Sequence, residues 1–267
     1  MEKRPYPESQ IHQLKPGLWL INDNEVYMYL IEGKEKALLI DTGWGIRNLR
    51  QIIAGLTALP LLVVNTHGHL DHVCGNYQFE RLFIHHWDAL MMREKFTRET
   101  RCRKINRFSG MALPLDFDET RWVEAKAPEV TLLQGAEHFD LGGRVIEVIE
   151  TPGHSPGSIC FLDQQEKLLF TGDTVIENII LLHLPESQSL ETFQKSISKL
   201  RSCTKQVEFI FPSHGKIFLE PCILMDLENL IGEIISGKTI GRSREIFSLP
   251  GLFCKKGNVG LIYKAKI

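Results

Sequence analysis

The chain has 267 residues, 43% hydrophobic and 24% charged, with 31 Lys and Arg against 33 Asp and Glu for a formal net charge of −2. This composition excludes disordered, collagenous and disulfide-scaffold proteins, and it disfavours dedicated nucleic-acid or membrane-surface proteins, which carry excess basic charge. No apolar run approaches the ~20 residues of a membrane span. Because no secretory signal is evident and the six cysteines form no Cys-x-x-Cys pair, we expect a cytoplasmic protein with reduced thiols.

Hydrophobic patterns in the first half of the chain switch between strand and helix periodicity. An initial meander of three strands is followed by a helix and a buried strand. A polar loop begins where that buried strand ends. The predicted elements are strands at about 17–22, 26–32, 36–40, 61–64 and 81–84, and helices at about 46–56 and from residue 86.

The second half returns to strands and ends with two helices and a hairpin. We expect one mixed α/β (α+β) domain over residues 1–267, with a helical basic insert at about 86–120 and a C-terminal hairpin extension at about 240–267. The hairpin is expected to cap the fold or to support a homodimer. The predicted elements are strands at about 121–124, 130–133, 144–150, 158–162, 167–171 and 208–211, helices at about 188–201 and 221–236, and a hairpin at 246–263.

One segment, residues 93–107, carries seven Lys and Arg against only Glu94 and Glu99. Arginine pairs well with phosphate, so this segment suits an anionic substrate such as a CoA or phosphate group, or RNA. A solvated helix face explains it more simply, and we favour that interpretation.

A cluster of polar side chains follows the buried strand at 61–64, a position where layered α/β folds commonly build their sites. The motif His67-x-His69-x-Asp71-His72 packs three imidazoles and a carboxylate into six residues. Such a loop can direct donors to two sides, which suits a pair of metal ions.

Later clusters place His154, Asp173 and His214 beside Gly or Pro residues that favour sharp turns, each where a predicted strand ends. Imidazole and carboxylate donors without thiolate favour Zn(II), Fe(II) or Mn(II) with coordination positions open to water. We therefore interpret these three residues as further metal ligands.

These motifs, in this order, resemble those of the metallo-β-lactamase-fold hydrolase superfamily from about residue 17 to 220. The resemblance implies a four-layer αββα sandwich of two sheets with helices outside. It also implies that Asp41, in Leu-Ile-Asp-Thr-Gly, supports the metal site without binding the metal. The implied ligands are His67, His69 and His154 for the first ion, Asp71, His72 and His214 for the second, and Asp173 as the bridge.

Three positions indicate which branch of this superfamily the chain resembles. Common zinc β-lactamases have cysteine where Asp173 stands, flavo-diiron proteins have glutamate where His69 stands, and lactone hydrolases have tyrosine where Ile176 stands. The remaining resemblance is to glyoxalase II-like thioester hydrolases.

The expected activity is hydrolysis of a small ester or thioester by a hydroxide that bridges two divalent metal ions. Zinc is the expected metal, with iron or manganese as alternatives. Asp71 is the candidate to orient the water or to pass a proton. The expected partner is a small-molecule substrate; no membrane is expected, and nucleic acid is disfavoured.

Two alternatives on the same fold stay open: a phosphodiesterase or ribonuclease, suggested by the basic segment, and a mono-iron dioxygenase that acts on persulfides. A serine hydrolase is a third reading, because Gly-x-Ser155-x-Gly, Asp173 and His214 follow the order of a catalytic triad. We disfavour it because a strand-like run follows Gly157, whereas a nucleophile elbow leads into a helix.

Overall fold

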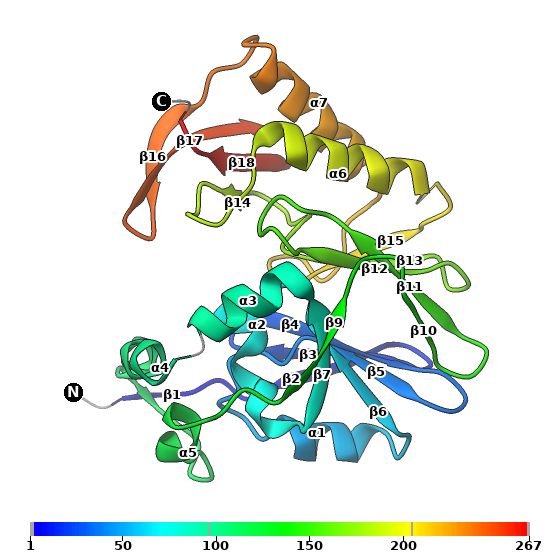
Figure 1. Cartoon of the computed structure of the whole chain (residues 1–267), viewed down its shortest axis with the longest axis vertical. Coiled ribbons are helices and arrows are strands. Elements are labelled where there is room, and N and C mark those ends of the chain that lie inside the picture. The colour runs from blue at the N-terminus through cyan, green and yellow to red at the C-terminus, as the bar shows by residue number, and fades with distance from the viewer. Residues whose placement is uncertain (1–2, 96, 204, 266–267) are drawn as a thin grey trace. The chain divides into compact units, whose positions relative to one another are not determined.

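A computed structural model describes residues 3–95, 97–203 and 205–265. The chain divides into two compact units, the first comprising residues 1–133 and 139–144, the second residues 134–138 and 145–267. Each unit combines β-sheet with helices, as an α/β chain should (Figure 1). Among the described residues, no helix is long and apolar enough to cross a membrane.

The first unit is built on a seven-stranded sheet in the order β2-β3-β4-β5-β6-β7-β9. The strands from β2 to β5 pair in antiparallel, whereas β5, β6, β7 and β9 run parallel. β5 is a continuous apolar run that is wholly buried, which is typical of a parallel strand covered on both faces. The bounds are β2 (Gln10–Lys15), β3 (Leu18–Asp23), β4 (Val26–Glu32), β5 (Ala37–Ile40), β6 (Leu61–Val64), β7 (Arg81–His85) and β9 (Glu129–Leu133).

Two helices of the first unit share one core cluster with alternate residues of this sheet. α1 (Leu49–Leu56) contributes Leu49 and Ile53, and α3 (His86–Lys95) contributes Ala89 and Met92. The other elements are α2 (Leu70–Val73), α4 (Arg98–Ile105), α5 (Glu119–Val123), the 3-10 helices η1 (Cys74–Gln78) and η2 (Asn106–Phe108), and the parallel pair β1 (Arg4–Pro5) and β8 (Met111–Ala112).

The strand predicted at 121–124 is wrong, because residues 119–123 form helix α5. The side chain of Asp118 caps this helix by accepting a hydrogen bond from the backbone N–H of Arg121 (2.8 Å). Trp122 and Val123, which suggested a strand, are buried in a core cluster with Phe108. A local helix cap therefore outweighs the β-propensity of this apolar pair.

The second unit contains two sheets. In one, β11, β12 and β13 pair in antiparallel and β15 joins β13 in parallel; the other has the order β14-β18-β17-β16. Helices α6 and α7 lie side by side (Figure 1) and bury Phe193, Ile197, Leu227 and Leu230 in the core of this unit. The bounds are β11 (Val145–Glu150), β12 (Ile159–Asp163), β13 (Leu168–Gly172), β14 (Ile180–Leu182), α6 (Leu190–Cys203), β15 (Phe209–Pro212), α7 (Ile223–Ile235), β16 (Arg242–Ile246), β17 (Leu249–Lys256) and β18 (Val259–Tyr263), while β10 (His138–Asp140) lies where the two units divide.

The predicted C-terminal hairpin is formed by β17 and β18 around Gly257, whose φ of +59° suits a tight turn. Two features were not predicted: β16 adds a third strand, and β18 pairs in parallel with β14. β18 is buried along its whole length. The hairpin is therefore part of the core of the second unit.

A buried pair of side chains anchors the N-terminal segment of the first unit. The phenol of Tyr6 donates a hydrogen bond to Oδ1 of Asp23 (3.1 Å), and both side chains are buried. Burial raises the pKa of the Asp23 carboxyl from 3.8 to about 6.

We expect Asp23→Asn to stabilise the protein at pH 7. At a pH between about 4 and about 6, the Asp23 carboxyl is protonated in the folded protein but not in the unfolded chain. The wild-type protein therefore loses stability as the pH rises through this range. The variant lacks this loss, so its free energy of unfolding should exceed that of the wild type by about 1–3 kcal/mol at pH 7 and by much less near pH 4. Urea unfolding at the two pH values measures this, and a variant less stable than the wild type at pH 7 would contradict it.

Candidate metal centre

The first unit gathers three histidine rings on the loop and the short helix α2 that follow β6. His67 and His72 are buried, and His69 is half-buried. The ring centroid of His67 lies 4.7 Å from that of His69 and 4.0 Å from that of His72. Asp71 lies in the first turn of α2, with its Oδ1 3.9 Å from Nε2 of His72. All four residues of the first predicted cluster thus lie close together.

Asp41 follows β5 and contacts this loop at several atoms. Its Oδ1 accepts a hydrogen bond from the backbone N–H of Thr66 (2.8 Å), and its Oδ2 accepts one from the Thr66 hydroxyl (2.8 Å) and lies 2.9 Å from Nδ1 of His72. The backbone of Asp41 is left-handed, with φ at +65°, a strained conformation for a residue with a side chain. Asp41 therefore holds His72 by Nδ1, so Nε2 is the ring nitrogen with which His72 could bind a metal.

Two further residues that support this loop were not predicted as parts of the site. Oγ1 of Thr66 lies 2.9 Å from Nδ1 of His67. Oδ2 of Asp88, a buried residue of α3, accepts a hydrogen bond from the backbone N–H of Gly68 (2.8 Å). Thr66 adjoins the histidine motif and could have been found from its position. Asp88 carries no such signal, because a single acidic residue early in a helix is common.

The second unit places one carboxylate between two histidines. Oδ2 of Asp173 lies 3.5 Å from Nε2 of His154, and Oδ1 lies 3.5 Å from Nε2 of His214. Nδ1 of His154 lies 2.8 Å from the carbonyl oxygen of Leu181 in β14, so Nδ1 carries the proton and donates it. Each oxygen of Asp173 therefore faces a different imidazole nitrogen, an arrangement suited to a carboxylate that bridges two cations.

Glycines shape the turns that carry these residues. A Cβ added to Gly153, just before His154, would lie 2.2 Å from the ring of Phe193, so only glycine lets α6 pack this closely. Gly172, just before Asp173, has a φ of +51°, which glycine adopts without strain. The Gly-rich spacing seen in the sequence thus reflects close packing at these two turns.

The donors of each unit fit divalent metal ions. His67, His72 and His154 each engage Nδ1 with a protein oxygen, as metal-binding imidazoles usually do. Imidazole and carboxylate donors suit zinc, iron(II) and manganese(II). Cys74 lies instead in a core cluster, fully buried, and this burial raises the pKa of its thiol to about 12.

The interpretation of residues 93–107 as a solvated helix face is wrong for Arg101. This side chain is fully buried; it donates from Nη1 to the carbonyl of Trp122 (2.8 Å) and from Nη2 to the carbonyl of Cys74 (3.2 Å). Its guanidinium also lies 4.8 Å from the centre of the Trp122 ring. Arg101 thus connects helix α4 to the segment after His72. The exposed basic residues of this stretch are Arg93, Arg98, Arg103, Lys104 and Arg107.

The serine-hydrolase alternative is contradicted by the element that follows Ser155. Strand β12 begins at Ile159, whereas a nucleophile elbow must lead directly into a helix.

Comparison with known proteins agrees with the sequence motifs. The family model of the Metallo-beta-lactamase superfamily matches residues 21–214. The acyl-coenzyme A thioesterase MBLAC2 of Bos taurus is 32% identical over 210 residues, which cover 73% of this chain and 75% of that protein. The hydroxyacylglutathione hydrolase GloC of Haemophilus influenzae is 31% identical over 147 residues, covering 55% of this chain and 64% of that protein.

A solved structure shows the same fold. The metallo-beta-lactamase from Pontibacter korlensis matches with a TM-score of 0.62 at 19% identity, covering 84% of this chain and 99% of that one. The fold predicted from the sequence is thereby confirmed.

We expect Asp41→Asn to weaken metal binding by about 10–100-fold, because the amide has one acceptor oxygen instead of two and cannot accept from all three donors of Thr66 and His72. A competitive zinc titration against a chromophoric chelator measures the change. Glu99→Gln, which alters an exposed carboxylate of the same unit, should bind zinc like the wild type. Equal affinities for Asp41→Asn and Glu99→Gln would refute the supporting role of Asp41.

We expect Arg101→Met to lower the free energy of unfolding by about 2–4 kcal/mol, because the carbonyls of Cys74 and Trp122 lose charged donors in a buried site. Arg103→Met, on the exposed side of the same helix, should change it by less than about 0.5 kcal/mol. Urea unfolding of the two metal-free variants gives the comparison; similar losses in both would argue against a structural anchor at Arg101.

Proposed function

Because the chain belongs to the Metallo-beta-lactamase superfamily and is a metal-dependent hydrolase, we propose that it hydrolyses thioesters of the acyl-coenzyme A class with two divalent metal ions, zinc being the expected metal. The proposed ligands are His67, His69 and His154 for one ion, Asp71, His72 and His214 for the other, and Asp173 for both.

The geometry of Asp173 is the observation that carries the two-ion proposal. Its two oxygens face the Nε2 atoms of two different histidines at the same distance of 3.5 Å. This separation exceeds a hydrogen bond, and it is compatible with a cation at each oxygen. A carboxylate that served a single ion would not need a histidine on each side.

The substrate class rests on the chemistry of the relatives. MBLAC2 is an acyl-coenzyme A thioesterase, and GloC hydrolyses hydroxyacylglutathione, which is also a thioester. The two proteins differ in the thiol carrier and share the bond that is cleaved. Thioester cleavage is therefore the activity that both relatives support, and the longer match to MBLAC2 favours coenzyme A as the carrier.

The chain's own residues would orient the attacking water and keep the metal-binding histidines in place. When bound, the two ions supply hydroxide at neutral pH and polarise the thioester carbonyl. The carboxylate of Asp71, which is partly exposed, would orient the attacking water and accept its proton. The water oxygen would bond to the carbonyl carbon as the C–S bond breaks, and the proton taken up by Asp71 would pass to the departing sulfur, so that a carboxylic acid and a thiol are released. Asp41 would keep His72 in the tautomer that binds through Nε2.

The decisive experiment measures metal content and hydrolysis together. Zinc-loaded protein should contain two metal ions per chain and hydrolyse acyl-coenzyme A, and a chelator should abolish the activity. Asp173→Asn should lower kcat/KM by about 100-fold or more and reduce the metal content, because one amide oxygen cannot serve two ions. Asp226→Asn, which alters an exposed carboxylate of α7, is the matched control and should behave as the wild type.

Three results would overturn the proposal. Thioesterase activity that survives chelation would remove the metal from the reaction. One iron per chain with oxygen consumption on glutathione persulfide would identify the dioxygenase. Cleavage of a phosphodiester with no thioester hydrolysis would identify the phosphodiesterase.

A further inference from the structure

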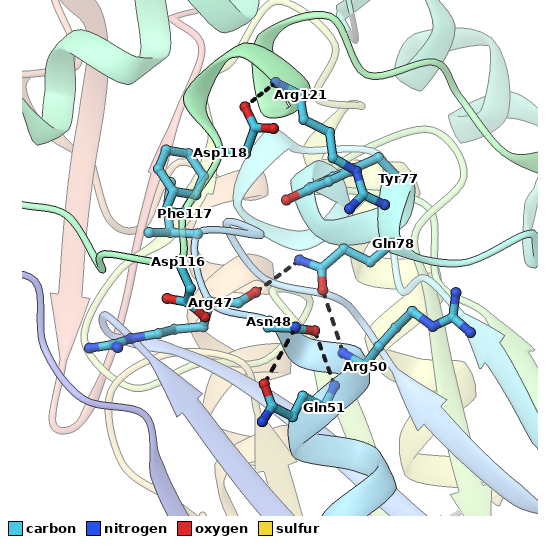
Figure 2. Close-up of a pocket in the computed structure, with 11 residues that line it drawn as sticks. Arg47, Asn48, Arg50, Gln51, Tyr77, Gln78, Asp116, Phe117, Asp118 and Arg121 are labelled. Carbon is cyan, nitrogen blue, oxygen red and sulfur yellow. Dashed lines mark hydrogen bonds between the residues drawn. The ribbon is translucent and has the colours of Figure 1, made fainter.

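A pocket of about 440 Å³ opens in the first unit at the start of helix α1 (Figure 2). Three segments line it: the loop into α1 (residues 46–51), the end of η1 (residues 77–78) and the start of α5 with the loop before it (residues 116–121). None of the predicted metal ligands is among its lining residues.

Gln78 fixes the shape of this pocket. Its buried side chain accepts a hydrogen bond at Oε1 from the backbone N–H of Leu49 (2.8 Å) and donates from Nε2 to the carbonyl of Arg47 (2.9 Å). The hydroxyl of Tyr77 donates to the carbonyl of Gly45 (3.0 Å). The loop before α1 is therefore held against η1, and the pocket is preformed rather than a gap between mobile loops.

Three arginines surround the opening, and two of them keep their charge available. Arg47 pairs with Glu8 and donates to the carbonyls of Tyr6 and Pro7. Arg50 and Arg121 are exposed, and within the part of the chain described by the structure neither forms an ion pair. Two guanidinium groups at one pocket, each without a carboxylate partner, favour an anionic ligand that accepts several hydrogen bonds, such as a phosphate.

Aromatic rings and acceptors lie beside these charges. The guanidinium of Arg121 lies 5.7 Å from the centre of the Tyr77 ring, and Phe117 supplies a second ring to the pocket (Figure 2). Asp118 is occupied as the cap of α5, whereas Asp116 adds an exposed acceptor. The Phe117 ring for stacking, an acceptor for an exocyclic amine and arginines for phosphate together match a phosphorylated adenosine better than a bare phosphate.

From this combination we infer that the pocket binds the phosphorylated adenosine end of coenzyme A. The inference rests on the proposed thioesterase function and names the part of the substrate that the chain recognises away from the metal. Arg50 and Arg121 bind phosphate, and Phe117 stacks on the base.

The position of the pocket along the chain is compatible with this role. η1 begins two residues after the metal-ligand candidate His72 and ends at Gln78 in the pocket. Five residues of fully extended chain span at most about 18 Å, and a 3-10 helix spans less, so Tyr77 lies within that distance of His72. In this proposal the long pantetheine arm of coenzyme A, which separates its thioester from its nucleotide, spans the distance between the metal ligands and the pocket.

A pair of substrates with the same acyl group tests the inference. The double variant Arg50→Gln/Arg121→Gln should raise KM for acyl-coenzyme A about tenfold or more and leave kcat nearly unchanged, because it removes charged hydrogen bonds remote from the thioester. The same variant should hydrolyse the acyl thioester of N-acetylcysteamine, which has no nucleotide, as fast as the wild type. Arg103→Gln, an exposed arginine of α4 outside the pocket, should leave both substrates unaffected.

Binding measured without turnover separates this inference from the proposed function. Adenosine 3′,5′-bisphosphate should bind the wild-type protein in isothermal titration calorimetry, and the double variant should lose this binding. If no thioester is hydrolysed but the bisphosphate binds through Arg50 and Arg121, the thioesterase proposal fails and the nucleotide site stands. Equal KM values for the double variant and the wild type, or binding of inorganic phosphate alone, would overturn the nucleotide site.

Discussion

The candidate metal-binding loop of the first unit depends on one buried carboxylate. Asp41 has no exposed surface, and three donors from Thr66 and His72 surround it. An ionised carboxylate inside a protein is strongly destabilising unless such donors are present, so a loop conformation that withdraws one of them is costly. The strained backbone of Asp41 is maintained for the same reason. The histidine rings are therefore oriented by the protein itself, before any ligand is considered.

The first group of candidate ligands could be proposed from the sequence because two local signals adjoin each other. β6 is a short apolar run, and the polar motif starts at residue 65, directly after it. Elements with weaker local signals were missed or misassigned. β2 is mostly exposed and shows no clear alternation, so it was not predicted. The apolar pair in α5 favours a strand when considered alone, and only the cap at Asp118 reveals the helix.

Other features depend on contacts between distant segments and could not be predicted from composition. Arg101 and Arg103 are the same residue type on one helix, yet the first is buried and the second is exposed. The difference arises because the carbonyls of Cys74 and Trp122, far away in the chain, converge on one position of α4. The pocket at α1 is similar, since Gln78 joins two segments whose proximity no sequence pattern indicates.

The parallel pairing of β14 with β18 has a consequence for biosynthesis. β14 lies at the edge of its sheet, so β18 is its one strand partner there. β14 begins at residue 180 and β18 only at residue 259, so the partner is synthesised about 79 residues later. At about 5–20 residues per second, the ribosome needs roughly 4–16 s to supply it. During this interval Ile180 and Leu182 lack the strand that covers them, and Leu181, whose carbonyl accepts from His154, lacks its partner Ile262. The pairing that holds the carbonyl beside His154 therefore forms only after β18 has been synthesised.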